Sequence, residues 1–165
     1  MGTKNIKSGV EYFTPDVYTD FRGDLWTLWQ KEKSGDFDLP YNHDKVSTSR
    51  KNVLRGIHGD TKSHKLITCL YGEIYFVTVD NRIQSDTYKK WDWEILSDKN
   101  RTQVLLEPGI GNGFFVLSDT CVFHYKWFYD GQYPDVDEQF TIKWNDPDIN
   151  IFWPSQTPIL QKRDL

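Results

Sequence analysis

Short runs of β-branched and aromatic residues, separated by glycine, proline and Asn/Asp turns, constrain the fold of this chain most strongly. The clearest run is Glu73–Val79, in which apolar residues alternate along the chain, and Tyr71-Gly72 supplies a turn before it. No window shows sustained helical periodicity, and Thr27–Lys33 offers only a short helical segment. The pattern predicts an all-β fold, either a sandwich or a jelly-roll barrel. Further strands are predicted at Lys65–Cys69, Gln103–Glu107, Phe114–Leu117 and Cys121–Phe128.

The length of 165 residues fits a single domain over residues 1–165, which would bury roughly two-thirds of its unfolded surface. Seven Trp, nine Tyr and ten Phe can fill a sheet core and leave rings for stacking on a ligand. The tail from Trp153 to Leu165 contains prolines, so we expect it to pack over the barrel in short turns.

Charge and cysteine usage exclude several classes of partner. The net charge is −4 and the Lys and Arg residues form no basic stripe, so nucleic acid is not an expected partner. No apolar run is long enough to span a bilayer, so no membrane association is expected. Cys69 and Cys121 are widely separated and flanked by apolar residues. They are expected to be buried thiols in a reducing cytoplasm, which makes the protein cytoplasmic.

The run Arg55-Gly56-Ile57-His58-Gly59-Asp60, followed by Lys65, places a histidine and a lysine next to a glycine turn. Histidine exchanges a proton near neutral pH, and lysine can neutralise an oxyanion. With Tyr125 and Asp164 they form a set suited to moving a proton at a carbon beside a carbonyl. These residues alone leave a second interpretation open, in which His58 only satisfies a turn and Lys65 is a solvated charge.

Jelly-roll barrels often hold a metal through several histidines and a carboxylate, but this chain lacks that pattern. Its histidines are His43, His58, His64 and His124, and no His-x-His occurs. The segment Pro108–Phe114 carries Asn112 where a further ligand would stand, and His64, beside Lys65, is expected at the surface. No metal site is predicted.

A series of short motifs resembles a known family, the nucleoside-diphosphate 4-keto-sugar 3,5-epimerases typified by dTDP-4-dehydrorhamnose 3,5-epimerase. The resemblance runs from about Tyr12 to the last residues. It implies a cupin-type jelly-roll barrel with short peripheral helical turns, a homodimer, and epimerisation beside a C4 ketone without a cofactor. The motifs, in chain order, are Tyr18–Gly23, Arg55–His58, Lys65-Leu66, Gly72-Glu73, Val79–Arg82 with Ser85 and Thr87-Tyr88, Pro108-Gly109, Gly113-Phe114, Tyr125-Lys126, Trp144–Pro147, Trp153-Pro154 and Lys162–Asp164.

The resemblance implies a role for each residue of the catalytic set. His58 matches the base, and Asp164 matches the carboxylate that orients it and fixes the imidazole tautomer. Lys65 matches the cation beside the C4 oxygen, which stabilises the enolate. Tyr125 matches the tyrosine that returns a proton from the opposite face. Inversion requires groups on both faces, because a single base returns the proton to the face from which it came.

The same resemblance implies which residues bind the substrate. Arg55 and Arg22 match arginines that hold the diphosphate, whose oxygens suit the guanidinium fork. Arg22 is expected to serve either its own site or that of the neighbouring subunit.

Departures from the family pattern fall at positions expected to contact the nucleotide or sugar. His43-Asp44-Lys45 replaces Gln-x-Asn before Ser47-Thr48-Ser49, Thr27 replaces a glutamate, and Gly59-Asp60 replaces Tyr-Gln. Asn112 replaces a histidine that supports the reacting end of the sugar, which leaves open whether C3 alone or both C3 and C5 are inverted. His43, Lys45, Ser47 and Asn112 are therefore candidate substrate contacts.

This combination resembles the branch of the family that acts on GDP-4-keto-heptoses in bacterial capsule pathways. The sequence thus predicts a cofactor-independent epimerase of a nucleotide-linked 4-keto sugar. Two alternatives remain open. One is a 3,4-ketoisomerase on the same barrel, and the other is a carbohydrate-binding jelly roll without catalytic activity.

Overall fold

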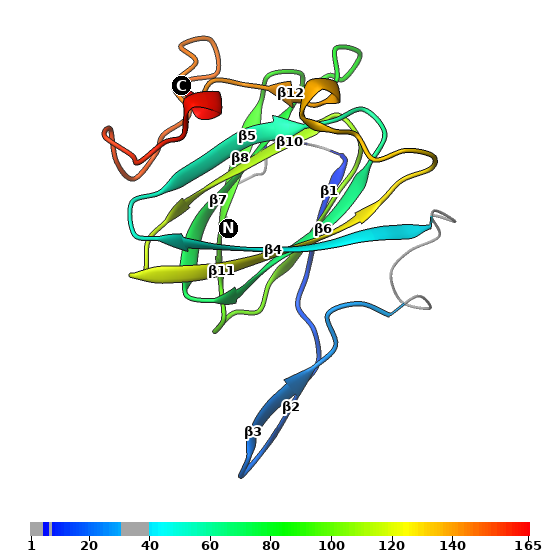
Figure 1. Cartoon of the computed structure of the whole chain (residues 1–165), viewed down its shortest axis with the longest axis vertical. Helices are drawn as coiled ribbons and strands as arrows, with labels where there is room; N and C mark the ends of the chain where they lie inside the picture. The colour runs from blue at the N-terminus through cyan, green and yellow to red at the C-terminus, as the bar shows by residue number, and fades with distance from the viewer. Residues whose placement is uncertain (1–4, 7, 31–39) are drawn as a thin grey trace.

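The computed structural model describes residues 5, 6, 8–30 and 40–165, and they form a jelly-roll barrel of two facing antiparallel sheets (Figure 1). The first sheet has the order β1-β9-β6-β11-β4, formed by Val10–Phe13, Gln103–Leu106, His64–Tyr71, Thr120–Phe128 and Tyr41–Arg50. The second has the order β12-β5-β10-β7-β8, formed by Phe140–Thr141, Leu54–Gly59, Ile110–Val116, Glu73–Asp80 and Trp91–Ser97. The all-β prediction is confirmed. None of the helices formed by the described residues could cross a membrane.

A separate hairpin, β2 (Val17–Asp20) with β3 (Gly23–Trp26), projects away from the barrel (Figure 1). The only helical segments among the described residues are the short 3-10 turns η2 (Val136–Glu138) and η3 (Lys162–Asp164). The predicted short turns at the periphery are thus present. The predicted helical segment at Thr27–Lys33 is wrong for residues 27–30, which are irregular, and residues 31–33 lie outside the described part.

The sequence of strand β7 is almost continuously apolar because both faces of the second sheet are buried there. Ile74 and Phe76 pack inside the barrel, while Tyr75 and Val77 pack on the outer face of the sheet. That outer face is covered by the C-terminal tail through buried apolar side chains that include Trp153. Because side chains alternate between the faces of a strand, both sets must be apolar when both faces are buried.

Two strand boundaries correct the sequence analysis. His58 lies within strand β5 and not beside a turn, and β10 begins at Ile110, earlier than the predicted Phe114. Both errors arise from treating glycines as turn residues. Here they allow close packing of backbones: a Cβ on Gly56 would lie 2.6 Å from the carbonyl oxygen of Asn112, and φ of Gly56 is +108°. This close approach places His58 directly opposite Asn112.

Candidate active site

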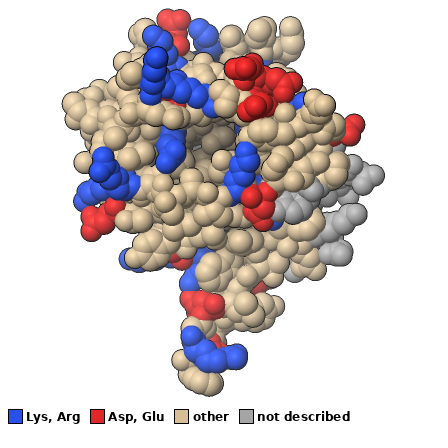
Figure 2. Space-filling view, viewed as in Figure 1, with Lys and Arg blue, Asp and Glu red and all other residues tan. Residues whose placement is uncertain are grey.

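A pocket of about 230 Å³ opens between the two sheets and gathers most of the predicted site residues. Its cationic side chains are Arg55, Lys65 and Arg163, and no carboxylate of a described residue is among those that line it. Figure 2 shows the molecule hollowed at this level, with basic side chains beside the opening. Such a pocket suits an anionic ligand. Its aromatic lining comprises Phe114, Phe123, Tyr125, Trp127 and Tyr133.

His58 and Asp164 come from distant parts of the chain and meet at the wall formed by the second sheet. Nε2 of His58 lies 2.8 Å from Oδ1 of Asp164, whose side chain is fully buried. Asp164 belongs to η3, which packs on β5. A buried carboxylate beside one ring nitrogen fixes the imidazole tautomer and its orientation, leaving the other nitrogen for proton exchange. Such an arrangement is chemically capable of general-base catalysis.

Lys65 is buried on the first sheet and is not a solvated charge. Its side chain is 6% exposed, and Nζ lies 3.3 Å from Oδ2 of Asp60 and 4.3 Å from the ring centroid of Trp127. Burial lowers the pKa of Lys65 from its ordinary value of 10.5, and the Asp60 carboxylate opposes this by favouring the charged form. A desolvated cation at a pocket wall stabilises a developing oxyanion more strongly than one in water.

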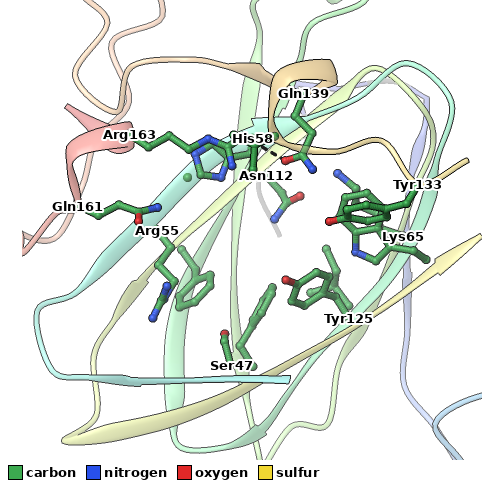
Figure 3. A pocket seen from close by; sticks show the side chains of 16 residues that line it. Ser47, Arg55, His58, Lys65, Asn112, Tyr125, Tyr133, Gln139, Gln161 and Arg163 are labelled. Carbon is green, nitrogen blue, oxygen red and sulfur yellow. Dashed lines mark hydrogen bonds between the residues drawn. The ribbon is translucent and has the colours of Figure 1, made fainter. Parts of the chain in front are cut away.

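Tyr125 also belongs to the first sheet, on β11, and faces the pocket across from His58 (Figure 3). Its ring packs against Phe123 and Trp127. Burial raises the pKa of Tyr125 above its ordinary value of 10.0, and Tyr133 adds to this effect. The hydroxyl therefore stays protonated at neutral pH, as a proton donor must.

Arg55 and Ser47 line the pocket below His58 (Figure 3). Nε of Arg55 donates a hydrogen bond of 2.8 Å to Oγ of Ser49, and one terminal nitrogen donates to the carbonyl of Thr48. These contacts tie the guanidinium to the edge strand β4 and leave it with no ion pair to a described carboxylate. It is held in place with its charge available to a ligand.

Arg22 does not reach the pocket of its own chain. It lies at the tip of the β2–β3 hairpin, where its guanidinium pairs with Asp20 at 2.6 Å and its side chain is 76% exposed. Thr27 likewise lies away from the pocket, where its carbonyl accepts a hydrogen bond from Gln103. Neither residue can contact a ligand bound between the sheets of the same chain.

His43 and Lys45 stand behind the pocket lining and not in it. Nζ of Lys45 donates to the hydroxyl of Tyr133 and lies 4.0 Å from the centroid of that ring. His43 packs edge-on against the same ring, and its Nδ1 lies 2.6 Å from the hydroxyl of Tyr129. The two residues therefore orient Tyr133, which does line the pocket.

Gly59 and Asp60, which depart from the family pattern, serve packing and hydrogen bonding within the barrel. A Cβ on Gly59 would lie 2.3 Å from the ring of Phe140, and one on Gly111 would lie 3.1 Å from it. The two glycines thus form a socket for Phe140. Asp60 is buried beside Lys65 and accepts backbone hydrogen bonds from Lys62 and Ser63. The expectation that these positions contact the nucleotide or sugar is wrong for this pair, whereas Asn112 does line the pocket.

Several pocket residues were not identified from the sequence. Tyr133, Gln139 and Gln161 lie outside the motifs, and Arg163 lies within the last motif, where only Asp164 was assigned a role. The alternation along β11 was a usable signal for Trp127, because residues two apart share a face of a strand and Tyr125 points into the pocket. No comparable local pattern marks the other four, which come from loops and, for Arg163, from the turn η3.

His64 and the two cysteines do not line the pocket. His64, expected at the surface, is half-buried, and burial lowers its pKa. Cys69 and Cys121 are buried free thiols, as predicted, and burial raises the pKa of Cys69 to about 12, which makes it unreactive. No cluster of His, Cys, Asp and Glu among the described residues could hold a metal ion.

Comparisons with known proteins agree on one family. The model of the dTDP-4-dehydrorhamnose 3,5-epimerase family matches residues 5–165. The dTDP-4-dehydrorhamnose 3,5-epimerase of Methanothermobacter thermautotrophicus is 36% identical over 92% of this chain and 82% of its own length. The dTDP-4-dehydrorhamnose 3-epimerase of Streptomyces niveus is 33% identical over 94% of this chain and 77% of its own.

Among solved structures, dTDP-6-deoxy-D-glucose-3,5-epimerase of Legionella pneumophila, in complex with dTDP-4-keto-L-rhamnose, superposes with a TM-score of 0.86. It is 32% identical, and the match covers 94% of this chain and 84% of that one. Likeness at this level extends over most of the chain.

Proposed function

We propose a specific reaction for this chain, which belongs to the dTDP-4-dehydrorhamnose 3,5-epimerase family. It inverts C3 of a GDP-linked 4-keto-heptose. The coarser part of this statement follows from the family itself: the chain is an epimerase of nucleotide-linked 4-keto sugars. The nucleotide, the sugar, the carbon and the roles of individual residues are the proposal. A surface-polysaccharide or capsule sugar would be the product, made in the cytoplasm without a cofactor.

In the proposed reaction, His58 removes the proton from the carbon beside the C4 ketone. The electron pair of the broken C–H bond forms a double bond between that carbon and C4. The ketone oxygen takes up the negative charge, so an enolate forms beside the Lys65 cation. Tyr125 then gives its proton to the same carbon from the opposite face, and the enolate returns to a ketone. Solvent restores both groups to their starting protonation states, so the sugar changes only in configuration.

The observation that carries this proposal is the placement of proton-transfer groups on opposite walls of one pocket. His58, with Asp164 at 2.8 Å, lies on the second sheet, while Tyr125 and Lys65 lie on the first. A binding module has no need of a base with a buried orienting carboxylate and a desolvated lysine beside it. Incubation of the enzyme with candidate 4-keto sugars in heavy water, followed by NMR, tests it: a binder exchanges no substrate hydrogen with solvent.

The choice of GDP rests on the residues around Tyr133. His43 and Lys45 replace the Gln-x-Asn of the thymidine-binding pattern, and both contact Tyr133 at the pocket wall. A site built for the edge of one base leaves polar groups unpaired with another base. Titration of GDP and dTDP at the same salt concentration distinguishes them. Tighter binding of dTDP, with faster turnover of a dTDP-4-keto-hexose, would contradict the assignment.

The choice of C3 rests on Asn112, which faces the pocket directly opposite His58 on the neighbouring strand. An amide cannot replace the titrating imidazole found at this position in the family pattern, so support for the reacting end of the sugar is altered. We expect deuterium from solvent at C3 and none at C5. Incorporation at both carbons at similar rates would show that Asn112 does not limit the reaction to C3.

The proposal also includes a homodimer in which Arg22 of one subunit completes the site of the other. The exposed hairpin tip carries Arg22 away from its own pocket, with Phe21 98% exposed beside it. Complementation tests this. Arg22→Ala and His58→Asn subunits, each weakly active alone, should regain activity when mixed, because one of the two sites then has both residues. If mixing restores nothing although mixed dimers form, Arg22 does not act across subunits.

A further inference from the structure

The turn that brings Asp164 to His58 follows Ile159, whose backbone pairs with the barrel at Asn52 and Leu54, and few polar contacts hold the chain beyond that point. Asp164 is the penultimate residue of the sequence, and its backbone N–H donates to the carbonyl of Gln161 within the turn. Neither carboxylate oxygen accepts a hydrogen bond of regular geometry from a described residue, although Oδ1 lies 2.8 Å from His58. A buried carboxylate costs stability unless its surroundings fix it in place. Other groups must therefore hold the turn.

One side-chain hydrogen bond ties this turn to another element. Nη2 of Arg163 donates to Oε1 of Gln139 at 3.1 Å, drawn as a dashed line in Figure 3. Among the described residues from Gln161 to the end of the chain, no other side chain makes a hydrogen bond to the barrel. Arg163 precedes Asp164 directly, so the bond acts on the residue next to the carboxylate.

Gln139 is itself held firmly, which makes it an effective anchor. Its Nε2 donates to the backbone carbonyl of Pro134 at 2.8 Å, which fixes the orientation of the side-chain amide. The amide oxygen Oε1 therefore faces Arg163. The next residue, Phe140, sits in the socket formed by Gly59 and Gly111. Strand β12 then pairs with β5, so the anchor is fixed to the strand that carries His58.

We propose that Gln139 is a positioning residue for the His58–Asp164 pair. Through Arg163 it holds the C-terminal turn, so that the carboxylate of Asp164 stays against the imidazole of His58. The inference rests on the proposed function, because it gives Gln139 a part in proton transfer at His58. A displacement of about 1 Å between groups that must be aligned can cost as much as a hundredfold in rate.

A double-mutant cycle tests the inference. Gln139→Leu removes the acceptor while keeping the approximate size of the side chain, and we expect kcat for hydrogen exchange from a dTDP- or GDP-linked 4-keto sugar to fall about tenfold with little change in KM. Gln139→Glu keeps an acceptor for Arg163 but loses the Nε2 donor to Pro134, so its kcat should lie between those of wild type and Gln139→Leu. Gln132→Leu is the matched control, since Gln132 is exposed in the same loop.

In the Asp164→Asn background, Gln139→Leu should lower the exchange rate no further, because the carboxylate that Gln139 positions is already gone. Equal falls in both backgrounds would overturn the inference, as would a wild-type rate in Gln139→Leu.

Nitrogen-15 NMR of the His58 ring gives a readout that needs no substrate. Gln139→Leu should shift the ring signals toward those of Asp164→Asn, and Gln132→Leu should not. Unchanged ring signals in Gln139→Leu would reject the inference even if the wild-type enzyme exchanged no hydrogen. Absence of exchange in wild type, with shifted ring signals, would reject the proposed function alone.

Discussion

The two walls of the pocket are built in different ways. The wall of the second sheet carries His58 on a strand packed closely through Gly56, Gly59 and Gly111, and it borrows Asp164 from the end of the chain. The wall of the first sheet carries Lys65 and Tyr125 on neighbouring strands, packed around Trp127. The proposed base, His58, is therefore placed by backbone contacts and a distant segment, and the proposed acid, Tyr125, by side chains within one sheet.

This difference indicates how each wall should respond to change. A group placed by neighbouring strands of one sheet is secured by the many contacts of that sheet. A group whose partner comes from the short turn η3 depends on fewer contacts, which can be lost singly. Substitution of His58 on one wall and of Tyr125 on the other should separate the steps of the reaction, with proton removal failing in the first case and inversion in the second.

The largest effect is expected at His58. His58→Asn removes the base from the second wall and should lower both turnover and hydrogen exchange by roughly 100- to 10,000-fold. The variant should stay folded, although loss of the imidazole beside the buried Asp164 should lower the melting temperature. Rates of exchange and of turnover, measured together with thermal unfolding, check this. A variant with near-normal exchange would remove His58 from the mechanism.

Tyr125→Phe should affect the other wall and the other step. Only the hydroxyl is lost, so the ring still packs on Phe123 and Trp127. We expect net inversion to fall roughly 100-fold while exchange at the substrate carbon falls only a few-fold, since His58 can return a deuteron to its own face. NMR of the product in heavy water measures both. Equal losses would mean that Tyr125 is not the acid on the far face.

Arg55→Met should weaken substrate binding without altering either wall's chemistry. The guanidinium is held by Ser49 at the pocket edge, with its charge available to a diphosphate. We expect KM to rise about tenfold and kcat to stay within about twofold, the pattern of an interaction shared by ground and transition states. Steady-state kinetics decides it, and a fall in kcat at constant KM would place Arg55 at the reacting centre instead.

A smaller effect is expected from alkaline pH. Burial lowers the pKa of Lys65 from its ordinary value of 10.5 and raises that of Tyr125 from its ordinary value of 10.0, so burial favours loss of the Lys65 proton and opposes loss of the Tyr125 proton as pH rises. The exchange rate should therefore decline below the ordinary pKa of lysine. The same decline should persist in Tyr125→Phe. A decline that vanishes in Tyr125→Phe would assign it to the tyrosine.

No effect is expected from chelation. The sequence shows no spacing of metal ligands, and the described residues hold no cluster that could bind a metal. Activity should survive prolonged treatment with a chelator and should need no added nicotinamide. Loss of activity that one added metal restores would show that the enzyme depends on a bound metal.

The same difference between the walls explains what the sequence could predict. The strands of the acid wall, β6 and β11, follow the apolar alternation and were predicted within a few residues. The sequence predicts a turn within strand β5, because glycines are typical of turns, whereas each of these glycines makes room for a neighbouring segment. Gln139 and Arg163 could not be found, because a contact between residues 24 apart leaves no local pattern. The pairing of His58 with Asp164 was expected only from family resemblance.

The central claim is that base and acid act from opposite walls on opposite faces of one carbon. A single turnover of a nucleotide-linked 4-keto sugar in heavy water, with the product analysed by NMR, tests it most directly. We expect each inverted product molecule to carry deuterium at C3, delivered to the face opposite the one that lost its proton. Inverted product without deuterium at C3, or deuterium only in sugar of unchanged configuration, would contradict the claim.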